Sequence, residues 1–301
     1  MDINRQSLDA LFKGFNLQFQ SGLDAAPATW NKFCGVAPSS TSTAVYPFLE
    51  QFGGMREWIG DRQIKNIASQ KIEVVNRDFE DTVSIRRNDI EDDQYGLYGT
   101  MIAQMGQNAA MLWQELAVES ILSNPVWVDG KTFFASDRAY GENSISNTTA
   151  SALSAESYAA ARKAMMEYKG HSNKMLAVVP NLMIVGPKNE ATAFSILKDR
   201  SIVAGATDKA AATDNPWMGS AEYIVMPELS GDYDDLWFLC STVGVLKPMM
   251  VQQRQTPRLV RLDRETDENV FLRKEYIYGA DARGAAFLAF PHLIYKGGTG
   301  A

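Results

Sequence analysis

The chain has 301 residues, 46% of them hydrophobic and 22% charged, and this balance is typical of a folded protein rather than a disordered one. Its formal net charge of −7 disfavours a dedicated nucleic-acid-binding domain, because phosphate binding needs a basic face. The N-terminus lacks the basic and apolar segments of a secretory signal, and no apolar run is long enough to cross a membrane.

The first fifty residues lack the pattern of a compact domain. Apolar residues recur at steps of three and four between Leu8 and Phe19, which predicts an amphipathic helix. Residues 22–47 are rich in Pro, Ser, Thr and Ala, yet they include Trp30 and Phe33. Two interpretations stay open: an arm that buries its aromatic side chains on another surface, or an ordered segment folded on its own domain.

Residues 56–93 are unusually charged, with seven basic and ten acidic residues. Ile72 and Val74 alternate with polar residues, as do Phe79 and Val83, but the two sets have opposite parity. The interruption between them predicts a bulge or twist that re-aims an extended strand. The preceding residues fit the other arm of a long hairpin, whose exposed edges the charges would protect.

A long helix is predicted next. Asn88, Asp89 and Glu91 fit a capping box, with Asn88 at the cap and Glu91 three residues further on. An apolar face of about 25 residues follows, and Asn124-Pro125 ends it. The predicted face comprises Tyr98, Met101, Met105, Ala109, Leu112 and Leu116.

The rest of the chain mixes helices and strands without a regular βαβ repeat, which favours an α+β fold. Asp129-Gly130 predicts a hairpin turn, and Ser154 predicts the cap of a helix that reaches about Lys169. We expect a second helix from about Asn189 to Arg200. The strands are expected in LAVVP, LMIVG, residues 223–225 and 236–240, and in MMVQQRQ, RLVRL, VFLRKEYIY and AAFLAFPHLIY near the C-terminus.

Two glycines five residues apart lie among the predicted C-terminal strands. The run GADARG, from Gly279 to Gly284, has the glycine spacing of a phosphate loop but lacks the Lys-Ser/Thr that should follow it. We therefore interpret Gly279 and Gly284 as parts of a structural turn between two strands.

No reactive constellation is visible. Cys34 and Cys240 match no metal or redox spacing and are predicted to be buried, and His171 and His292 have no metal-binding partner in sequence. We assign no catalytic, cofactor-binding or metal-binding residue. A carboxylate-dependent enzyme stays open, because the pairing of carboxylates in space is invisible in one sequence.

Four stretches stand in a distinctive order: FNLQFQ to MREWIGDR at 15–62, NRDFEDTVSIRRNDIEDDQYG at 76–96, DGKTFFASD at 129–137 and YIYGADARGAA at 276–286. Together they resemble the Mu-like phage major head subunit family of the gpT type, over nearly the whole chain. MREWIGDR and the block around DFEDTVSI are the most specific parts, and residues 201–217 match least well.

This resemblance implies the Hong Kong 97-like phage capsid fold, of class α+β. An N-terminal arm would occupy 1–47 and an extended loop 48–87. A spine helix near 97–123 and a peripheral domain would occupy 88–150, with strands from 241–283. An axial domain would occupy 151–240, with a final strand from 284–301.

The implied function is that of a major capsid protein, which self-assembles through pentamers and hexamers into an icosahedral shell around double-stranded DNA. Its place would be the virion, after assembly in the host bacterial cytoplasm. Its partners would be further copies of itself and DNA held without sequence specificity, then scaffold, protease, portal or decoration proteins, with no membrane. The charged loop supplies the candidate contacts between subunits: Arg56, Trp58, Arg62, Lys65, Lys71, Arg77, Asp78, Glu80 and Arg86.

Two alternatives remain at this point. The first is an encapsulin-type protein compartment of the same fold, which differs from a phage head in its cargo. The second is the carboxylate-dependent soluble enzyme.

Overall fold

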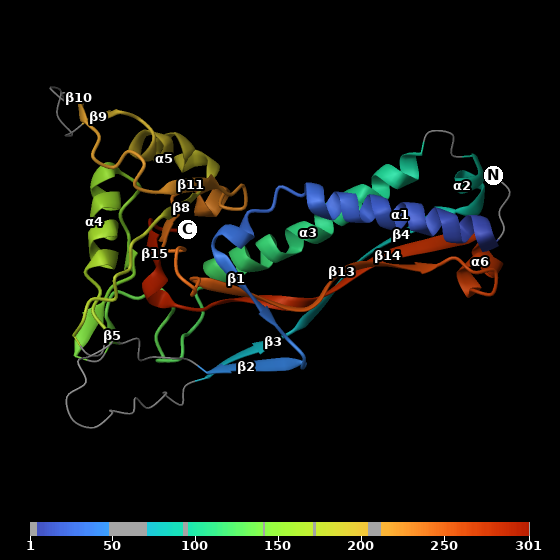
Figure 1. Ribbon diagram of the computed structural model, residues 1–301, viewed down its shortest axis with the longest axis horizontal. Coiled ribbons are helices and arrows are strands. Elements are labelled where there is room, and N and C mark those ends of the chain that lie inside the picture. Colours follow the sequence, from blue (N-terminus) through green and yellow to red (C-terminus); the bar gives the residue numbers. More distant parts are fainter. Residues whose placement is uncertain are drawn as a thin grey trace.

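The computed structural model describes residues 5–47, 71–92, 96–140, 142–170, 173–203 and 212–300. The molecule is elongated (Figure 1). One end is a platform, in which two long helices lie along a four-stranded sheet. The other end is a compact lobe built around a five-stranded sheet. The mixture of helices and strands agrees with the predicted α+β class.

The platform sheet has the strand order β1-β13-β14-β4. The long strands β13 and β14 form an antiparallel pair, β4 pairs antiparallel with β14, and β1 pairs parallel with β13. The platform elements are α1 (Arg5–Ala25), β1 (Cys34–Pro38), β4 (Arg77–Arg86), α2 (Arg87–Asp92), α3 (Leu97–Ser123), β13 (Met249–Leu262), α6 (Glu268–Arg273) and β14 (Glu275–Leu288), together with the 3₁₀ turn η1 (Trp30–Lys32).

The lobe sheet has the order β11-β8-β12-β15-β7. Its strands are β7 (Thr148–Thr149), β8 (Leu182–Val185), β11 (Glu222–Val225), β12 (Trp237–Cys240) and β15 (Ile294–Gly297), and its helices are α4 (Ala155–Met166) and α5 (Glu190–Leu197). Smaller elements are the hairpins β5 (Arg138–Tyr140) with β6 (Asn143–Ile145) and β9 (Ser201–Val203) with β10 (Ala212–Asp214), and the 3₁₀ turns η2 (Pro187–Asn189), η3 (Gly231–Tyr233) and η4 (Pro291–Leu293).

The spine helix α3 begins at Leu97 and ends at Ser123, with Asn124 in the left-handed conformation at φ 40°, so the predicted helix is confirmed. Its predicted face is right at Met105 and Leu116, which are buried, and wrong at Met101, which is 49% exposed. More of α3 is buried than one face, because α1 packs on one side and the sheets on another.

Helix α1 packs closely on α3. Phe15 and Phe19 are buried in this contact, and a Cβ on Gly106 of α3 would collide with the main-chain carbonyl of Phe19. Of the two interpretations of the N-terminal segment, the structure therefore shows the segment folded on its own chain. The parallel strand β1, which follows α1 in sequence, continues this attachment.

Three hydrophobic clusters form the core. One joins α1 and the first half of α3 to the outer part of the platform sheet. A second joins the rest of α3 to one face of the lobe sheet through residues such as Ile184 and Phe238. The third lies on the opposite face of that sheet, where Met183 and Trp237 contact the cluster under α4 and α5. Consecutive residues of β8 and β12 thus point into different cores, and both strands are fully buried.

The predicted parity break is confirmed at Asn76. β3 (Lys71–Val75) pairs with β2 (Thr43–Pro47) in a separate two-stranded ribbon, whereas β4 pairs with β14 in the platform. The strand changes sheets at this one residue. Ile72 on β3 and Phe79 on β4 both pack against the cluster at the C-terminal half of α3, and Val83 packs against the cluster beneath α1.

Several other predictions are confirmed. Cys34 and Cys240 are free and buried, and burial raises the pKa of both thiols. Ser154 caps α4 in a reciprocal capping box with Ser157. Gly130 adopts a φ of +82° in the turn after Trp127.

The turn predicted at Gly279 and Gly284 is wrong. Both glycines lie inside the continuous strand β14, paired with β13 on one side and β4 on the other. Gly284 is small for a packing reason: a Cβ there would collide with the main-chain carbonyl of Gln252 and lie 2.7 Å from the ring of Trp113 on α3. Gly284 lets the helix approach the strand.

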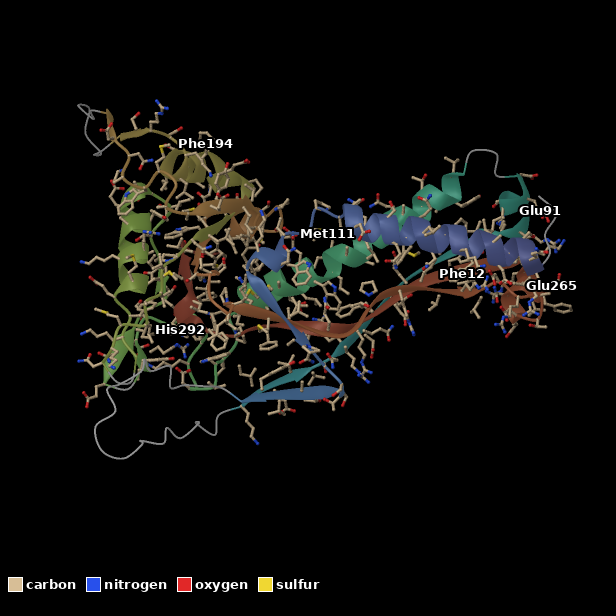
Figure 2. The ribbon with its side chains drawn as sticks, in the orientation of Figure 1. Phe12, Glu91, Met111, Phe194, Glu265 and His292 are labelled. Atoms are coloured by element: carbon tan, nitrogen blue, oxygen red, sulfur yellow. The ribbon has the colours of Figure 1, made fainter. Side chains whose placement is uncertain are left out.

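The predicted cap of the long helix is also wrong. Asn88 is the second residue of the separate short helix α2, and Glu91 forms a 3.0 Å ion pair with Arg87 at the far end of the platform (Figure 2). The cap of α3 is Gly96, at φ +66°, without a side-chain cap bond.

Other boundaries shift in smaller ways. Residues 270–273 of the predicted strand VFLRKEYIY belong to helix α6, and the strand begins at Glu275. Of LAVVP and LMIVG, only the second forms a strand, Leu182–Val185. Helix α4 ends at Met166 and α5 at Leu197, both earlier than predicted. The expected division at 283/284 falls inside β14, and the chain enters the lobe only after Leu288.

We predict that Gly284→Ala destabilises the fold by about 1–3 kcal/mol, the usual cost of overpacking, because neither Trp113 nor the strand backbone can move away cheaply. Gly279→Ala is the matched control. Its Cβ would lie 3.2 Å from the Thr82 hydroxyl and 3.5 Å from Val260, so a much smaller effect is expected. Urea unfolding measures both. Equal stability of the two variants would contradict the account of Gly284.

Candidate assembly surfaces

The ribbon of β2 and β3 leaves the platform and carries the base of the predicted loop (Figure 1). Pro47 and Lys71 are register partners at its outer end, so residues 48–70 are closed at their base by strand pairing. Four of the predicted contact residues, Arg56, Trp58, Arg62 and Lys65, lie in that stretch, outside the described residues.

A chain of hydrogen bonds anchors the ribbon to the platform strand β13. The Tyr46 hydroxyl donates to Gln252 Oε1 at 2.7 Å, and Gln252 Nε2 donates to Asn76 Oδ1 at 2.6 Å. Asn76 Nδ2 donates to the Thr41 carbonyl at 2.8 Å, and its main-chain N–H donates to the Ser42 carbonyl at 3.0 Å. Gln252 is fully buried and Asn76 is 7% exposed, so each lost partner would leave a costly unsatisfied polar group.

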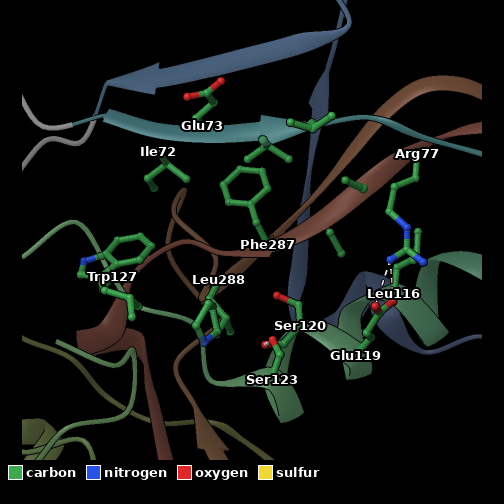
Figure 3. A pocket seen from close by; sticks show the side chains of 16 residues that line it. Ile72, Glu73, Arg77, Leu116, Glu119, Ser120, Ser123, Trp127, Phe287 and Leu288 are labelled. Carbon is green, nitrogen blue, oxygen red and sulfur yellow. Dashed lines mark hydrogen bonds and ion pairs between the residues drawn. The ribbon is translucent and has the colours of Figure 1, made fainter. Parts of the chain in front are cut away.

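A cleft of about 380 Å³ lies between the ribbon, the C-terminal part of α3 and the end of β14 (Figure 3). Its apolar lining includes Ile72, Leu116, Trp127 and Phe287. Phe287 also stacks on Tyr46, with ring centroids 5.0 Å apart. The ribbon is thus fixed to the platform by an apolar contact next to the buried amides.

At one rim of this cleft, Arg77 Nη1 donates to both carboxylate oxygens of Glu119 at 2.8 and 3.0 Å, and its guanidinium lies 5.2 Å from the Phe79 ring. Both partners of the ion pair are more than half exposed, so its contribution to stability is at most about 1 kcal/mol.

The other described contact candidates lie on the same ribbon and strand. Asp78 pairs with Arg283 at 3.0 Å, and Glu80 accepts a hydrogen bond from the Thr82 hydroxyl at 2.6 Å. Lys71 and Arg86 are exposed at opposite ends of the two strands. Arg77 and Asp78 therefore have partners within the chain, which the sequence did not reveal because those partners are distant in it.

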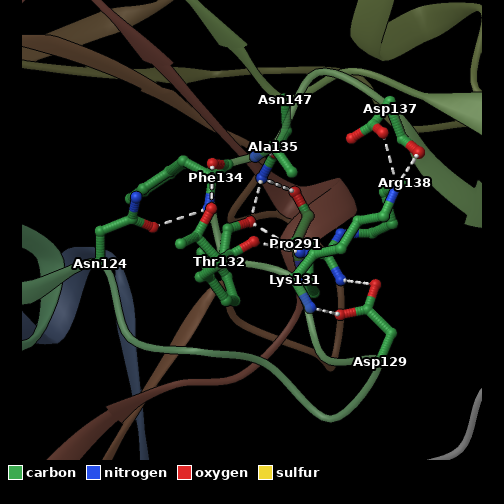
Figure 4. A network of polar contacts seen from close by, with 11 residues as sticks. Asn124, Asp129, Lys131, Thr132, Phe134, Ala135, Asp137, Arg138, Asn147 and Pro291 are labelled. Carbon is green, nitrogen blue, oxygen red and sulfur yellow. Dashed lines mark hydrogen bonds and ion pairs between the residues drawn. The ribbon is translucent and has the colours of Figure 1, made fainter.

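A second polar network lies where the chain passes between α3 and the lobe (Figure 4). The buried Arg138 pairs with Asp129 and donates to the carbonyls of Thr132 and Phe133. Asn147 accepts from the Ala135 N–H at 2.9 Å and donates to the Phe133 and Pro291 carbonyls at 3.1 Å. Most main-chain groups of these loops are not paired in a strand ladder, so the side chains of Arg138 and Asn147 supply hydrogen bonds to several of them. Only the turn at Asp129 was predicted.

His292 is buried in the lobe, next to the rings of Tyr140 and Phe290 (Figure 2). Burial lowers its pKa to about 4, because the apolar surroundings disfavour the charged imidazolium. The residue is therefore neutral in the folded protein near pH 7.

In the parts of the chain that the structure describes, no cluster of three or more His, Cys, Asp or Glu side chains is placed to hold a metal ion. No helix among those residues has the length and apolar character to cross a membrane. The features that could contact another molecule are the cleft between the ribbon and α3 and the ribbon of β2 and β3 itself.

The structure of the chain is similar to those of solved phage capsid proteins. The procapsid of bacteriophage JBD30 superposes with a TM-score of 0.62 at 27% sequence identity, over 99% of this chain and 77% of that one. The fold is the α+β phage capsid fold, and the class of protein is a capsid subunit, as expected.

The family follows from the sequence comparison. The model of the Mu-like prophage major head subunit gpT matches residues 8–152, 146–229 and 226–299, and the chain belongs to this family. It is 26% identical over 290 residues to the Mu-like prophage FluMu major head subunit of Haemophilus influenzae, covering 95% of this chain and 72% of the relative. It is also 26% identical over 293 residues to the major capsid protein of Escherichia phage Mu, covering 96% and 73%.

The family is one of structural head proteins, so the chain is a major head subunit and not an enzyme, and its place is the virion. The resemblance drawn from the sequence motifs is confirmed. The carboxylate-dependent enzyme and the encapsulin-type compartment are not favoured.

We predict that Asn76→Ala loosens the ribbon, because Gln252 Nε2 would lose its main partner in a buried site. The expected loss of stability is about 1–3 kcal/mol, with faster tryptic cleavage at Lys71 and Arg77. Ser42→Ala is the matched control, because Asn76 bonds to the main-chain carbonyl of Ser42, which the substitution leaves in place. Equal cleavage of wild type and Asn76→Ala would contradict the anchor.

His292 should make stability depend on pH. Its folded pKa of about 4 lies below the unfolded value of 6.5, so the unfolded chain binds the extra proton as the pH falls from 6.5 to 4. Stability should fall by about 3 kcal/mol across that window, at 1.36 kcal/mol per unit. Chemical unfolding at several pH values measures the slope. A slope unchanged in His292→Gln would refute this role.

Proposed function

We propose that this head subunit assembles through pentamers and hexamers into an icosahedral shell that encloses double-stranded DNA, and that assembly takes place in the host bacterial cytoplasm. The observation that carries the proposal is the ribbon of β2 and β3. It departs from the platform at Asn76 and holds the charged residues 48–70 by their two ends, at Pro47 and Lys71. A surface built in this way suits contact with another copy.

The proposal assigns roles to the parts of the chain. Residues 48–87 are the extended loop that reaches a neighbouring subunit. Residues 1–47 are the N-terminal arm. Residues 88–150, which include α3, form the peripheral domain together with the platform strands after residue 241, and the lobe is the axial domain around the local five- or six-fold axis. The structural change of direction after Leu288 supports a domain boundary there, instead of at 283/284.

Weak and numerous contacts suit such an assembly. An exposed ion pair contributes about 0–1 kcal/mol, so a wrongly placed subunit can dissociate before the shell closes. Many such contacts acting together still make the closed shell stable. Two of the candidate residues also form ion pairs within the chain, Arg77 with Glu119 and Asp78 with Arg283. The candidates are Arg56, Trp58, Arg62, Lys65, Lys71, Arg77, Asp78, Glu80 and Arg86.

The net charge of −7 supports a container that holds DNA without sequence specificity and without tight binding. Scaffold, protease, portal and decoration proteins are further candidate partners of the shell.

Replacing residues 62–70 with a Gly-Ser linker of equal length tests the proposal. The linker keeps the ribbon closed, so the circular dichroism spectrum and melting temperature should stay close to those of the wild type, while closed shells should disappear from negative-stain micrographs. The same replacement of residues 204–210 is the control and should leave shells intact. Normal shells from the 62–70 variant would refute the role of the loop.

A further inference from the structure

The spine helix carries a buried polar side chain at a position where its pattern calls for an apolar one. Gln114 begins a stripe that continues through Ala117, Val118 and Ile121, which are the positions i, i+3, i+4 and i+7 of one helical face. Those three residues are buried in the cluster that joins α3 to the lobe sheet. Gln114 is only 4% exposed, so its amide is also withdrawn from water.

Both ends of this amide form hydrogen bonds. Thr29 donates to Gln114 Oε1 through its main-chain N–H at 2.8 Å and through its hydroxyl at 3.3 Å. Gln114 Nε2 donates to Glu228 Oε1 at 2.6 Å. Thr29 precedes η1 in the N-terminal segment, and Glu228 lies between β11 and η3 in the lobe. One side chain of the spine helix thus bonds to both the N-terminal segment and the lobe.

The turn that carries Glu228 is firmly attached to the lobe sheet. The Met226 N–H donates to the Val185 carbonyl at the end of β8 at 2.9 Å, and the Leu229 N–H donates to the Met226 carbonyl at 3.1 Å. Met226 and Leu229 are both buried in the cluster between α3 and the lobe. Glu228 is therefore fixed to the lobe sheet, as Gln114 is fixed to α3.

A carboxylate in this position is costly. Glu228 Oε2 is buried, and no described residue forms a hydrogen bond with it. An apolar pair of similar size at positions 114 and 228 would avoid that cost. A polar pair, however, is directional, since a hydrogen bond needs one geometry, whereas the burial of apolar surface has no preferred direction. The pair can therefore select one orientation of the lobe where the surrounding apolar contacts would accept several.

We propose that the hydrogen bond between Gln114 and Glu228 fixes the angle of the lobe on the platform, and that this angle sets the curvature of the assembled shell. The inference rests on the proposed assembly function. The C-terminal half of α3 runs from the platform to the lobe, so a bond at Gln114 lies where the two parts meet (Figure 1). Since every subunit repeats this angle, a small change in it would alter the inclination of all its neighbours.

Thr29 has a separate role in the joint. An amide can present either its oxygen or its nitrogen to a neighbour, and only the nitrogen can donate to a carboxylate. Because Thr29 donates to Oε1, Nε2 is left to face Glu228. The N-terminal segment thereby orients the amide that holds the lobe.

Exchange of the two side chains tests the bond. Gln114→Glu places a second carboxylate opposite Glu228, so repulsion should open the joint at neutral pH. Gln114→Glu with Glu228→Gln reverses the hydrogen bond and still offers Thr29 a carboxylate oxygen, so it should restore the wild type. Gln104→Ala removes an exposed amide that bonds to Asn108 on the same helix, and it is the control.

Electron cryomicroscopy of the particles measures the effect on curvature. The diameters of Gln114→Glu particles should spread at least twofold more widely than those of the wild type. The exchanged pair and the control should both give the wild-type distribution. An unchanged distribution in Gln114→Glu, or an exchanged pair that fails to restore it, would overturn the proposal.

Distances within the unassembled subunit measure the angle directly. Spin labels at Lys13→Cys on α1 and Lys163→Cys on α4 report on the platform and the lobe, and both positions are exposed. The native Cys34 and Cys240 are buried and should not react with the label. Double electron–electron resonance should give a distribution at least twice as wide for Gln114→Glu as for the wild type. Equal widths would overturn the proposal.

An apolar pair separates the angle from the stability of the fold. Gln114→Met with Glu228→Met keeps the length of both side chains and removes the buried charge, so its midpoint of urea unfolding should equal or exceed that of the wild type. The distance distribution should nevertheless widen, because no directional bond remains. A distribution as narrow as that of the wild type would overturn the proposal.

Shell formation by the wild type tells the two proposals apart. If wild-type shells form and Gln114→Glu gives the same shells, the joint fails and the assembly function stands. If the wild type forms no shells, the assembly function fails, and the labelled subunit still tests the joint.

Discussion

The packing of α3 is the constraint on which the rest of the structure depends. Its first half is covered by α1, where Gly106 lets the helices approach, and its second half lies on the platform and lobe sheets. Trp113 rests on β14 at Gly284, a strand position that has no room for a side chain. One helix therefore fixes the N-terminal segment, the long strands and the lobe with respect to one another.

The ribbon is attached to this rigid body through the buried amides of Asn76 and Gln252 and through the stack of Tyr46 on Phe287. The strand changes sheets at Asn76, and the buried amides of Asn76 and Gln252 satisfy the polar groups that the change would otherwise leave unpaired. The charged side chains of Lys71, Glu73 and Arg77 near that point are exposed. A head subunit needs both properties: a body that keeps its shape and contacts that can form reversibly.

Much of this architecture could be predicted from the sequence where the signal was local. The C-terminal end of α3, the break at Asn76 and the cap at Ser154 each depend on a few adjacent residues. Gly284 is required because the ring of Trp113 lies against it, and Arg77 forms an ion pair with Glu119. Both partners are distant in sequence, so a local pattern shows neither contact. The residues 56–65 of the candidate contact set lie outside the described structure, and their role stays a prediction.

The central claim is that the loop between Pro47 and Lys71 joins one copy to another across a platform that keeps its own packing. Electron cryomicroscopy of the assembled wild-type chain tests it most directly. The account predicts closed shells in which residues 48–70 of each subunit lie on a neighbouring subunit, with α3 still packed on β14 at Gly284. A discrete small oligomer, or shells in which that loop folds back on its own chain, would contradict it.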